Sequence, residues 1–119
     1  MADRPVVSPA AAFSRGSVWW VELDPTRGSE IRKTGPAVVL TADGLNRARR
    51  TVVVVVPLST GPAPRPPIVV AVPSAGEGAV AVCDQLRAVD KSRLTRAGGA
   101  LSRADLRVVE DGVRAVLRL

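Results

Sequence analysis

The strongest constraint on the fold is a run of β-branched residues from Thr51 to Val56, one threonine followed by five valines. Such side chains favour extended backbone, and six residues suit a strand better than a helix. No polar residue alternates with the valines, so both faces of this strand should be buried, as at the centre of a curled sheet. We therefore expect further strands on either side of it.

Five other segments rich in β-branched or aromatic residues are predicted to be short strands. Turn-forming residues separate them, including the Pro-rich segment Ser59 to Pro67 and the glycine-containing segment Pro73 to Gly78. Short strands joined in this way favour a small β-barrel over a doubly wound sheet. The predicted strands are Ser17 to Leu23, Ala37 to Thr41, Ile68 to Val72, Ala79 to Cys83 and Gln85 to Val89.

A helical period replaces the strand pattern at the end of the chain. Ser102 is the predicted N-cap of this helix, and Gly112 lowers its propensity by about 1 kcal/mol relative to alanine, which a packed apolar stripe should outweigh. A shorter helical turn is predicted from Asp90 to Leu94, with Asp90 as its cap. The fold class is therefore mainly β with a C-terminal helix. The apolar stripe contains Leu106, Val109, Val113, Val116 and Leu117.

The length of 119 residues suffices for one core, so we expect one domain, residues 14–119, behind a flexible tail, residues 1–13. The tail lacks the layout of a signal peptide, and the longest apolar run, Val52 to Leu58, is too short to cross a membrane. Cys83 is the single cysteine and histidine is absent, so we expect no internal disulfide and no metal site built from thiols and imidazoles. We also expect no cofactor. Cys83 is predicted to be buried, and a cytoplasmic location is expected.

The chain carries 17 basic and 11 acidic residues, a net charge of +6. Such a charge favours a polyanionic partner, because neutralised phosphates release counterions. A GC-rich genome is an equally simple explanation, because 15 of the basic residues are arginine and Ala, Val, Gly and Pro are abundant. The charge alone leaves both explanations open.

A segment bounded by glycines, Gly28 to Gly35, lies between the first two predicted strands. We expect it to form most of a surface loop running from Leu23 to Pro36. Loops of this kind often present polar side chains to a ligand, although an ordinary solvated hairpin loop has the same composition.

Three segments in a fixed order resemble the MazF (PemK-like) toxins. Arg15 to Leu40, RGSVWWVELDPTRGSEIRKTGPAVVL, is similar to the family pattern of RGDVW, DLDP, GSE and a basic residue followed by PAVVL. Thr51 to Thr60 is similar to the family's third strand and the hydroxyl-bearing segment after it. Ala79 to Leu94 is similar to its acidic-Gln-Ile-Arg stretch and the following DKxRL motif. With compatible spacing, the resemblance covers Arg15 to Leu119.

This resemblance implies a homodimer of small SH3-like barrels and the toxin half of a type II toxin–antitoxin system. It implies a metal-independent endoribonuclease that cuts single-stranded RNA at short specific sequences. The implied partners are that RNA and a MazE-like antitoxin with an acidic tail.

The family's catalytic groups are an arginine directly before the Pro-Ala-Val segment and a hydroxyl after the third strand. The hydroxyl maps to Ser59, with Thr60 beside it, whereas the arginine position holds Gly35. Loss of one well-placed donor typically slows such a reaction about 100- to 1,000-fold. Three explanations compete: Arg32 or Lys33 replaces the missing group, the chain is an inactive or weakly active member, or the glycine arose in a clone selected against toxicity.

The remaining candidate residues follow from the same resemblance, each beside a simpler structural explanation. Glu30 is a candidate for proton transfer or a solvated loop carboxylate, and Ser59 is a phosphoryl donor or part of a capped turn. The indoles of Trp19 and Trp20 should point to opposite faces of a strand, with one of them at the dimer surface or available to stack on a base, although core packing is the default for either. The candidate RNA-binding residues are Ser29, Arg32, Lys33, Thr34, Thr60, Gln85 and Arg87.

Two other functions remain open on the sequence. One is a catalytically dead member that still binds RNA and antitoxin, which Gly35 favours. The other is a CcdB-like protein that has the same fold but inhibits gyrase, because fold alone does not define function.

Overall fold

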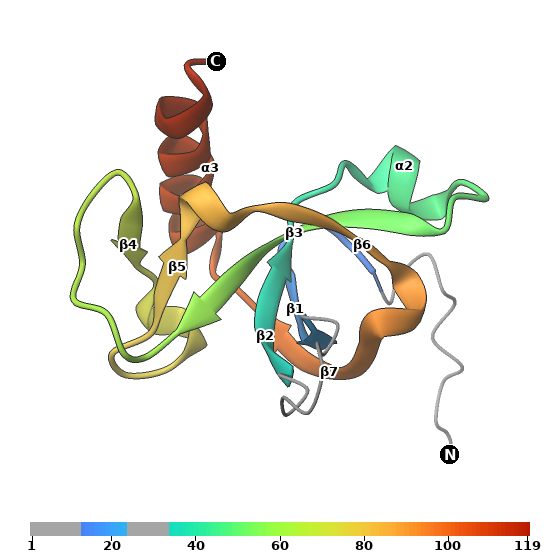
Figure 1. Cartoon of the computed structure of the whole chain (residues 1–119), viewed down its shortest axis with the longest axis horizontal. Coiled ribbons are helices and arrows are strands. Elements are labelled where there is room, and N and C mark those ends of the chain that lie inside the picture. The colour runs from blue at the N-terminus through green and yellow to red at the C-terminus, as the bar shows by residue number, and fades with distance from the viewer. Residues whose placement is uncertain (1–12, 24–33) are drawn as a thin grey trace, which may run out of the picture.

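The computed structural model describes residues 13–23 and 34–119, and in this part of the chain all strand pairs are antiparallel. The strands are β1 (Ser17–Glu22), β2 (Thr34–Val39), β3 (Val52–Ser59), β4 (Val69–Ala71), β5 (Val80–Val82), β6 (Arg87–Asp90) and β7 (Leu94–Ala100). The helices are α2 (Asp43–Arg47) and α3 (Arg103–Leu117), and the 3-10 turns are η1 (Pro73–Ala75), η2 (Cys83–Gln85) and η3 (Lys91–Arg93) (Figure 1).

The valine-rich strand β3 lies at the centre of the sheet. It pairs with β2 on one side, and on the other side with β6 along its first half and with β5 at its end. Val53, Val55 and Val56 have no exposed surface. The predicted central strand is confirmed, and it extends three residues further than expected, to Ser59.

Alternate residues of β2 and β3 belong to two separate apolar clusters, because neighbouring side chains on a strand point to opposite faces. The first cluster includes Val38 and Val56 and lies under α3. The second cluster includes Val39 and Val55 on the opposite face. Trp19 packs against the second cluster, with its ring centroid 5.0 Å from that of Phe13.

The predicted C-terminal helix is confirmed as α3, with Ser102 as its N-cap, where the Ser102 hydroxyl accepts a hydrogen bond from the Asp105 amide. Gly112 is buried, and a Cβ there would lie 2.6 Å from the Cys83 Sγ and 2.9 Å from the Pro67 carbonyl oxygen. Glycine is therefore needed for the close approach of α3 to η2. Leu117 is an exception to the predicted stripe, because its side chain is 48% exposed.

Cys83 is fully buried, as predicted, and its sulfur lies against α3. Burial raises the pKa of the thiol to about 11, with a smaller contribution from the neighbouring Asp84 carboxylate. The thiol is therefore protonated and unreactive at neutral pH.

Arg15 connects three elements that are distant in sequence. Its amide donates to the Asp43 carboxylate at 2.7 Å, its Nε donates to the Leu40 carbonyl oxygen at 2.9 Å, and its guanidinium pairs with Glu110 of α3. The hydrogen bond from the Arg15 amide holds the pKa of Asp43 below its usual value. An arginine of the family pattern thus has a structural role here.

Several predicted boundaries were wrong. β2 begins at Thr34 rather than Ala37 and ends at Val39, so Thr34 and Gly35 belong to a strand and not to a loop. Pairing with β1 extends the strand beyond the segment of high propensity. Gln85 lies in η2 rather than in a strand, whereas the helical turn capped by Asp90 is confirmed as η3.

Strand β7, helix α2 and the 3-10 turns η1 and η2 were not predicted. No helix among residues 13–23 and 34–119 is long and apolar enough to cross a membrane. The predicted tail, apart from Phe13, lies outside the described residues, as do Ser29, Glu30, Arg32 and Lys33.

Candidate nuclease site

The register of β2 and β3 places Gly35 and Ser59 on the same face of the sheet. Ala37 pairs with Pro57 in this antiparallel ladder, and Gly35 and Ser59 each lie two residues beyond that pair toward the same end. Side chains two residues apart on a strand share a face. The two positions that the family resemblance selected are therefore neighbours at one end of the sheet.

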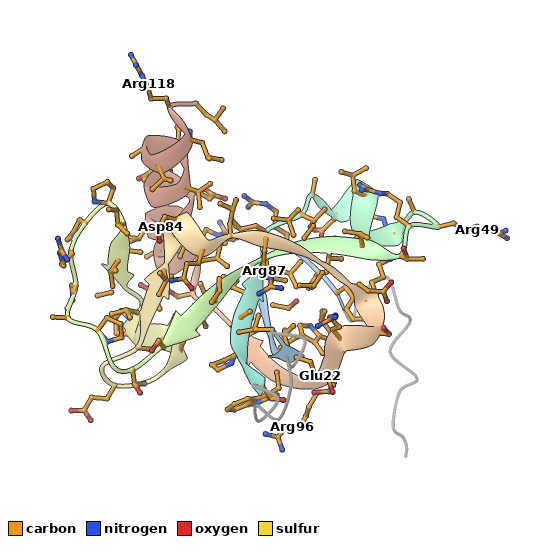
Figure 2. The ribbon with its side chains drawn as sticks, in the orientation of Figure 1. Glu22, Arg49, Asp84, Arg87, Arg96 and Arg118 are labelled. Atoms are coloured by element: carbon orange, nitrogen blue, oxygen red, sulfur yellow. The ribbon has the colours of Figure 1, made fainter. Side chains whose placement is uncertain are left out.

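Arg87 belongs to this face as well. It pairs with Val55 of β3, whose side chain is part of the second apolar cluster. Arg87 is half-buried and lies at the beginning of β6 (Figure 2). At this end of the sheet, the second apolar cluster is thus bordered by two polar residues, Ser59 of β3 and Arg87 of β6.

A hollow of about 620 Å³, which we call the Arg87 hollow, opens at this end. It brings together three of the candidate residues, Ser59, Gln85 and Arg87. Their surroundings are apolar, which would strengthen electrostatic interactions with a bound anion. The lining residues are Leu23, Pro57, Leu58, Ser59, Pro62, Val82, Gln85 and Arg87.

Gly35 has space for a side chain on the same face. Among the residues that the structure describes, a Cβ there would meet only the Leu23 Cδ1 atom, at 3.5 Å, which is an ordinary contact. Leu23 lines the Arg87 hollow. A long side chain at position 35 would therefore start beside the wall of this hollow.

The Ser59 hydroxyl is oriented by the turn that follows β3. Its Oγ accepts a hydrogen bond from the Gly61 amide at 3.2 Å. One lone pair is thus occupied, and the hydroxyl hydrogen remains available for a phosphoryl oxygen. Ser59 therefore caps the turn, which is the simpler explanation for this residue, and the cap is compatible with a role of the hydroxyl in binding.

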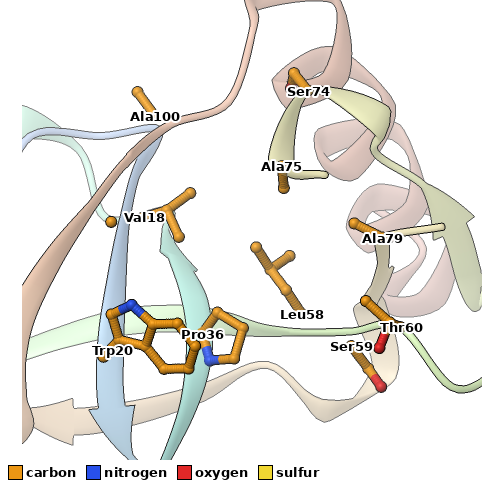
Figure 3. A pocket seen from close by; sticks show the side chains of 11 residues that line it. Val18, Trp20, Pro36, Leu58, Ser59, Thr60, Ser74, Ala75, Ala79 and Ala100 are labelled. Carbon is orange, nitrogen blue, oxygen red and sulfur yellow. The ribbon is translucent and has the colours of Figure 1, made fainter. Parts of the chain in front are cut away.

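A second hollow, of about 490 Å³, lies on the other side of Ser59, and we call it the Trp20 hollow (Figure 3). It shares Leu58 and Ser59 with the Arg87 hollow, and Thr60 belongs to it alone. The full lining consists of Val18, Trp20, Pro36, Leu58, Ser59, Thr60, Ser74, Ala75, Ala79, Gly98 and Ala100.

Thr34 is exposed and lies apart from both of these hollows, next to Trp20, Thr95 and Arg96. Asp84 is exposed in η2 and lines neither. The described segments contain no group of three or more His, Cys, Asp or Glu residues able to hold a metal ion. The candidate residues Ser29, Glu30, Arg32 and Lys33 precede β2 outside the described part.

The structure thus combines a curled antiparallel sheet and a terminal helix with a hydroxyl and an arginine at the open end of the second cluster. The chain belongs to the PemK-like, MazF-like toxins of type II toxin–antitoxin systems, and the profile of this family matches residues 14–117. The resemblance inferred from the sequence is thereby confirmed.

Two curated relatives are endoribonucleases. The chain is 34% identical to endoribonuclease MazF9 of Mycobacterium tuberculosis over 113 residues, which cover 88% of this chain and 96% of the relative. It is 40% identical to endoribonuclease PemK of Escherichia coli over 58 residues, 49% of this chain and 43% of PemK. The chain is thus homologous to endoribonucleases.

Solved structures share the fold. A MazE–MazF crystal structure from Deinococcus radiodurans superposes with a TM-score of 0.76 at 23% identity, covering 91% of this chain and 97% of that one. An endoribonuclease in complex with its cognate antitoxin from a mycobacterial species gives a TM-score of 0.72 at 22% identity, covering 89% and 95%. The predicted fold class is confirmed, whereas the homodimer stays a prediction.

Proposed function

We propose that this toxin cuts single-stranded RNA at a short specific sequence, without a metal ion, in the Arg87 hollow. The observation that carries the proposal is the shared face of position 35, Ser59 and Arg87 at the open end of the second cluster. Homology to endoribonucleases supports the same reaction.

The reaction needs a base for the proton of the 2′-hydroxyl group, stabilisation of the charge on the phosphoryl oxygens, and a proton for the leaving 5′-oxygen. The 2′-hydroxyl oxygen attacks the neighbouring phosphorus and loses its proton to a base, the bond from phosphorus to the 5′-oxygen breaks, and that oxygen takes up a proton. The products are a 2′,3′-cyclic phosphate and a 5′-hydroxyl. In our proposal Arg87 stabilises the charge on the phosphoryl oxygens, Ser59 donates a hydrogen bond to one of them, and Glu30 accepts the proton.

Gly35 removes the family's arginine from this arrangement. Glycine has neither charge nor side-chain donor, so the leaving 5′-oxygen has to take its proton from water, and part of the charge stabilisation is lost. We therefore propose a slow enzyme, in which Arg87 is the cation that the described residues place on the face of Ser59. The space beside Leu23 supports the view that an arginine at position 35 is compatible with the fold.

The test is incubation of the purified chain with a long single-stranded RNA in the presence of EDTA, followed by mapping of the fragment ends. We expect cuts at one recurrent short sequence, and Ser59→Ala should slow them about 100-fold, the usual effect of removing one donor. Ser92→Ala is the matched control, because Ser92 is exposed and lines neither hollow. Equal rates for the two variants would contradict the role given to Ser59.

A non-catalytic member that binds RNA and antitoxin is the second candidate function, and Gly35 is the observation that favours it. The proposed antitoxin is MazE-like and acidic, a choice supported by the net charge of +6 and by the antitoxin complexes of structural relatives. Binding of RNA with no cleavage by either the natural chain or Gly35→Arg would select this function.

A further inference from the structure

Trp20 lies between the Trp20 hollow and a second, outer hollow, on the face of the sheet opposite Gly35. It pairs with Pro36 across β1 and β2, whereas its neighbour Val21 pairs with Gly35. Trp20 and Pro36 therefore share a face, and both line the Trp20 hollow with Leu58 (Figure 3). The indole is half-buried, so part of its aromatic surface is available to a ligand.

Arg96 lies on the far side of the indole. It pairs with Trp20 across β1 and β7, and its guanidinium carbon is 5.1 Å from the centre of the Trp20 ring. Arg96 lines a small outer hollow with Trp20, Thr34 and Thr95 but is absent from the wall of the Trp20 hollow. It is exposed, and within the described ranges it forms no salt bridge, so its charge is available to an anion (Figure 2).

The polar groups at the rim of the Trp20 hollow are hydroxyls. Ser74 Oγ accepts a hydrogen bond from the Ser102 amide at 2.9 Å, so its own hydrogen is available to a ligand. Thr60 and Ser59 supply two more hydroxyls on the opposite rim. An aromatic wall with a rim of hydroxyl groups suits a flat heterocycle that has polar atoms along its edge.

We propose that the Trp20 hollow holds the base of a nucleotide adjacent to the cleaved phosphate, stacked on Trp20, and that Arg96 binds the next phosphate along the RNA. This inference rests on the proposed function, because the Trp20 hollow adjoins the proposed site of cleavage: Leu58 and Ser59 line both this hollow and the Arg87 hollow. The competing occupants are an apolar side chain of an acidic antitoxin and a second copy of this chain. The adjoining hydroxyl rim and the cation behind the indole favour a nucleotide.

The experiment measures binding of a fluorescent single-stranded RNA of random sequence, methylated at every 2′-oxygen so that it cannot be cut, at several salt concentrations. Ala75→Leu fills the hollow from an exposed position of η1, and Ala104→Leu adds the same group to an exposed position of α3 outside it. We expect Ala75→Leu to weaken binding about tenfold, within the range for loss of one stacked base, and Ala104→Leu to leave it unchanged.

The salt dependence separates base contact from phosphate contact. Arg96→Ala should reduce the slope of log K against log salt by about 0.7, the value for one phosphate on a single strand, and Arg96→Lys should retain it. Ala75→Leu should weaken binding at every salt concentration without changing the slope. Trp20→Phe should bind more tightly than Trp20→Ala, because it keeps an aromatic ring.

Equal binding by Ala75→Leu and Ala104→Leu, with Arg87→Ala impaired, would overturn this inference and leave the proposed function intact. Absence of RNA binding by the natural chain and by Gly35→Arg would refute both. Unchanged RNA binding by Ala75→Leu, combined with weaker binding to the MazE-like antitoxin proposed above, would assign the hollow to the antitoxin and overturn the inference.

Discussion

Two glycines in this chain have opposite surroundings. Gly112 lies inside a helix, where an added Cβ would be 2.6 Å from a sulfur atom and 2.9 Å from a carbonyl oxygen. Gly35 lies on a strand, where an added Cβ would meet, within the described part of the chain, one leucine methyl group at 3.5 Å. The absence of a side chain is thus required by packing at Gly112 and is unexplained by packing at Gly35.

The comparison separates the part of the molecule that stabilises the fold from the part that carries the chemistry. Around Gly112, α3 is fixed by close contact with Cys83 and by the Ser102 cap. Around Gly35, the sheet ends in an open hollow with room for a larger residue. Substitutions in the first region should change stability, and those in the second should change catalysis.

Gly35→Arg should have the largest effect. We expect RNA cleavage about 100- to 1,000-fold faster than in the natural chain, because the guanidinium supplies a missing donor beside Ser59. The measurement is the initial rate on the same RNA, with Gly35→Ala as the control that adds a side chain without charge. Equal rates for the arginine and alanine variants would show that position 35 is not the catalytic position.

Gly112→Ala should destabilise the fold by about 1 to 3 kcal/mol, the usual effect of overpacking, although alanine is the better helix former. The free energy of unfolding in urea measures this change. The double variant Gly112→Ala/Cys83→Ala should recover part of the loss, because the nearest colliding atom is gone, while the Pro67 carbonyl oxygen remains. A gain in stability for Gly112→Ala would disprove the close contact.

The pH dependence of stability should report on the burial of Cys83. Its pKa is raised from 9.0 to about 11 in the folded chain, so this stability contribution is complete below pH 9 and is lost as the pH rises toward 11. At pH 10 the loss should be about 1.4 kcal/mol, corresponding to a tenfold change in the folding equilibrium. Urea unfolding at pH 7 and pH 10 measures it. Cys83→Ala should lack this loss, and a similar loss in that variant would exclude the thiol as its cause.

Ser102→Ala should have the smallest effect, a loss of about 1 kcal/mol from the missing cap of α3. Its rate of RNA cleavage should match that of the natural chain while it remains folded, because Ser102 lines neither hollow. Thermal unfolding and a cleavage assay on the same preparation provide both values. A slower rate at full folding would mean that the two regions are coupled.

The sequence predicted those elements whose local pattern agrees with their place in the fold. The valines of β3 and the capped helix α3 have strong periodic signals, and both were found. Strand β7 has the sequence LTRAGGA, with two glycines and low strand propensity. It forms because β1 provides backbone partners along most of its length, and no local pattern reports such pairing.

The candidate site was predicted in part. The family resemblance selected Gly35 and Ser59 from separate motifs, but their shared face depends on the register of β2 and β3, which follows from pairing across the sheet. The alternation of side chains predicted that Trp19 and Trp20 point apart. Which of them lines a hollow depends on η1 and β7, segments far away in the sequence, so the sequence could not decide it.

The direction of α3 has a practical consequence for experiments on single molecules. Its last turns extend beyond the sheet, and the C-terminus lies on the side of the molecule opposite the start of β2 (Figure 1). Leu119, the final residue, is 81% exposed. A dye or a surface tether attached at this end would leave the Arg87 hollow open, so that individual RNA strands can be observed as they arrive and depart.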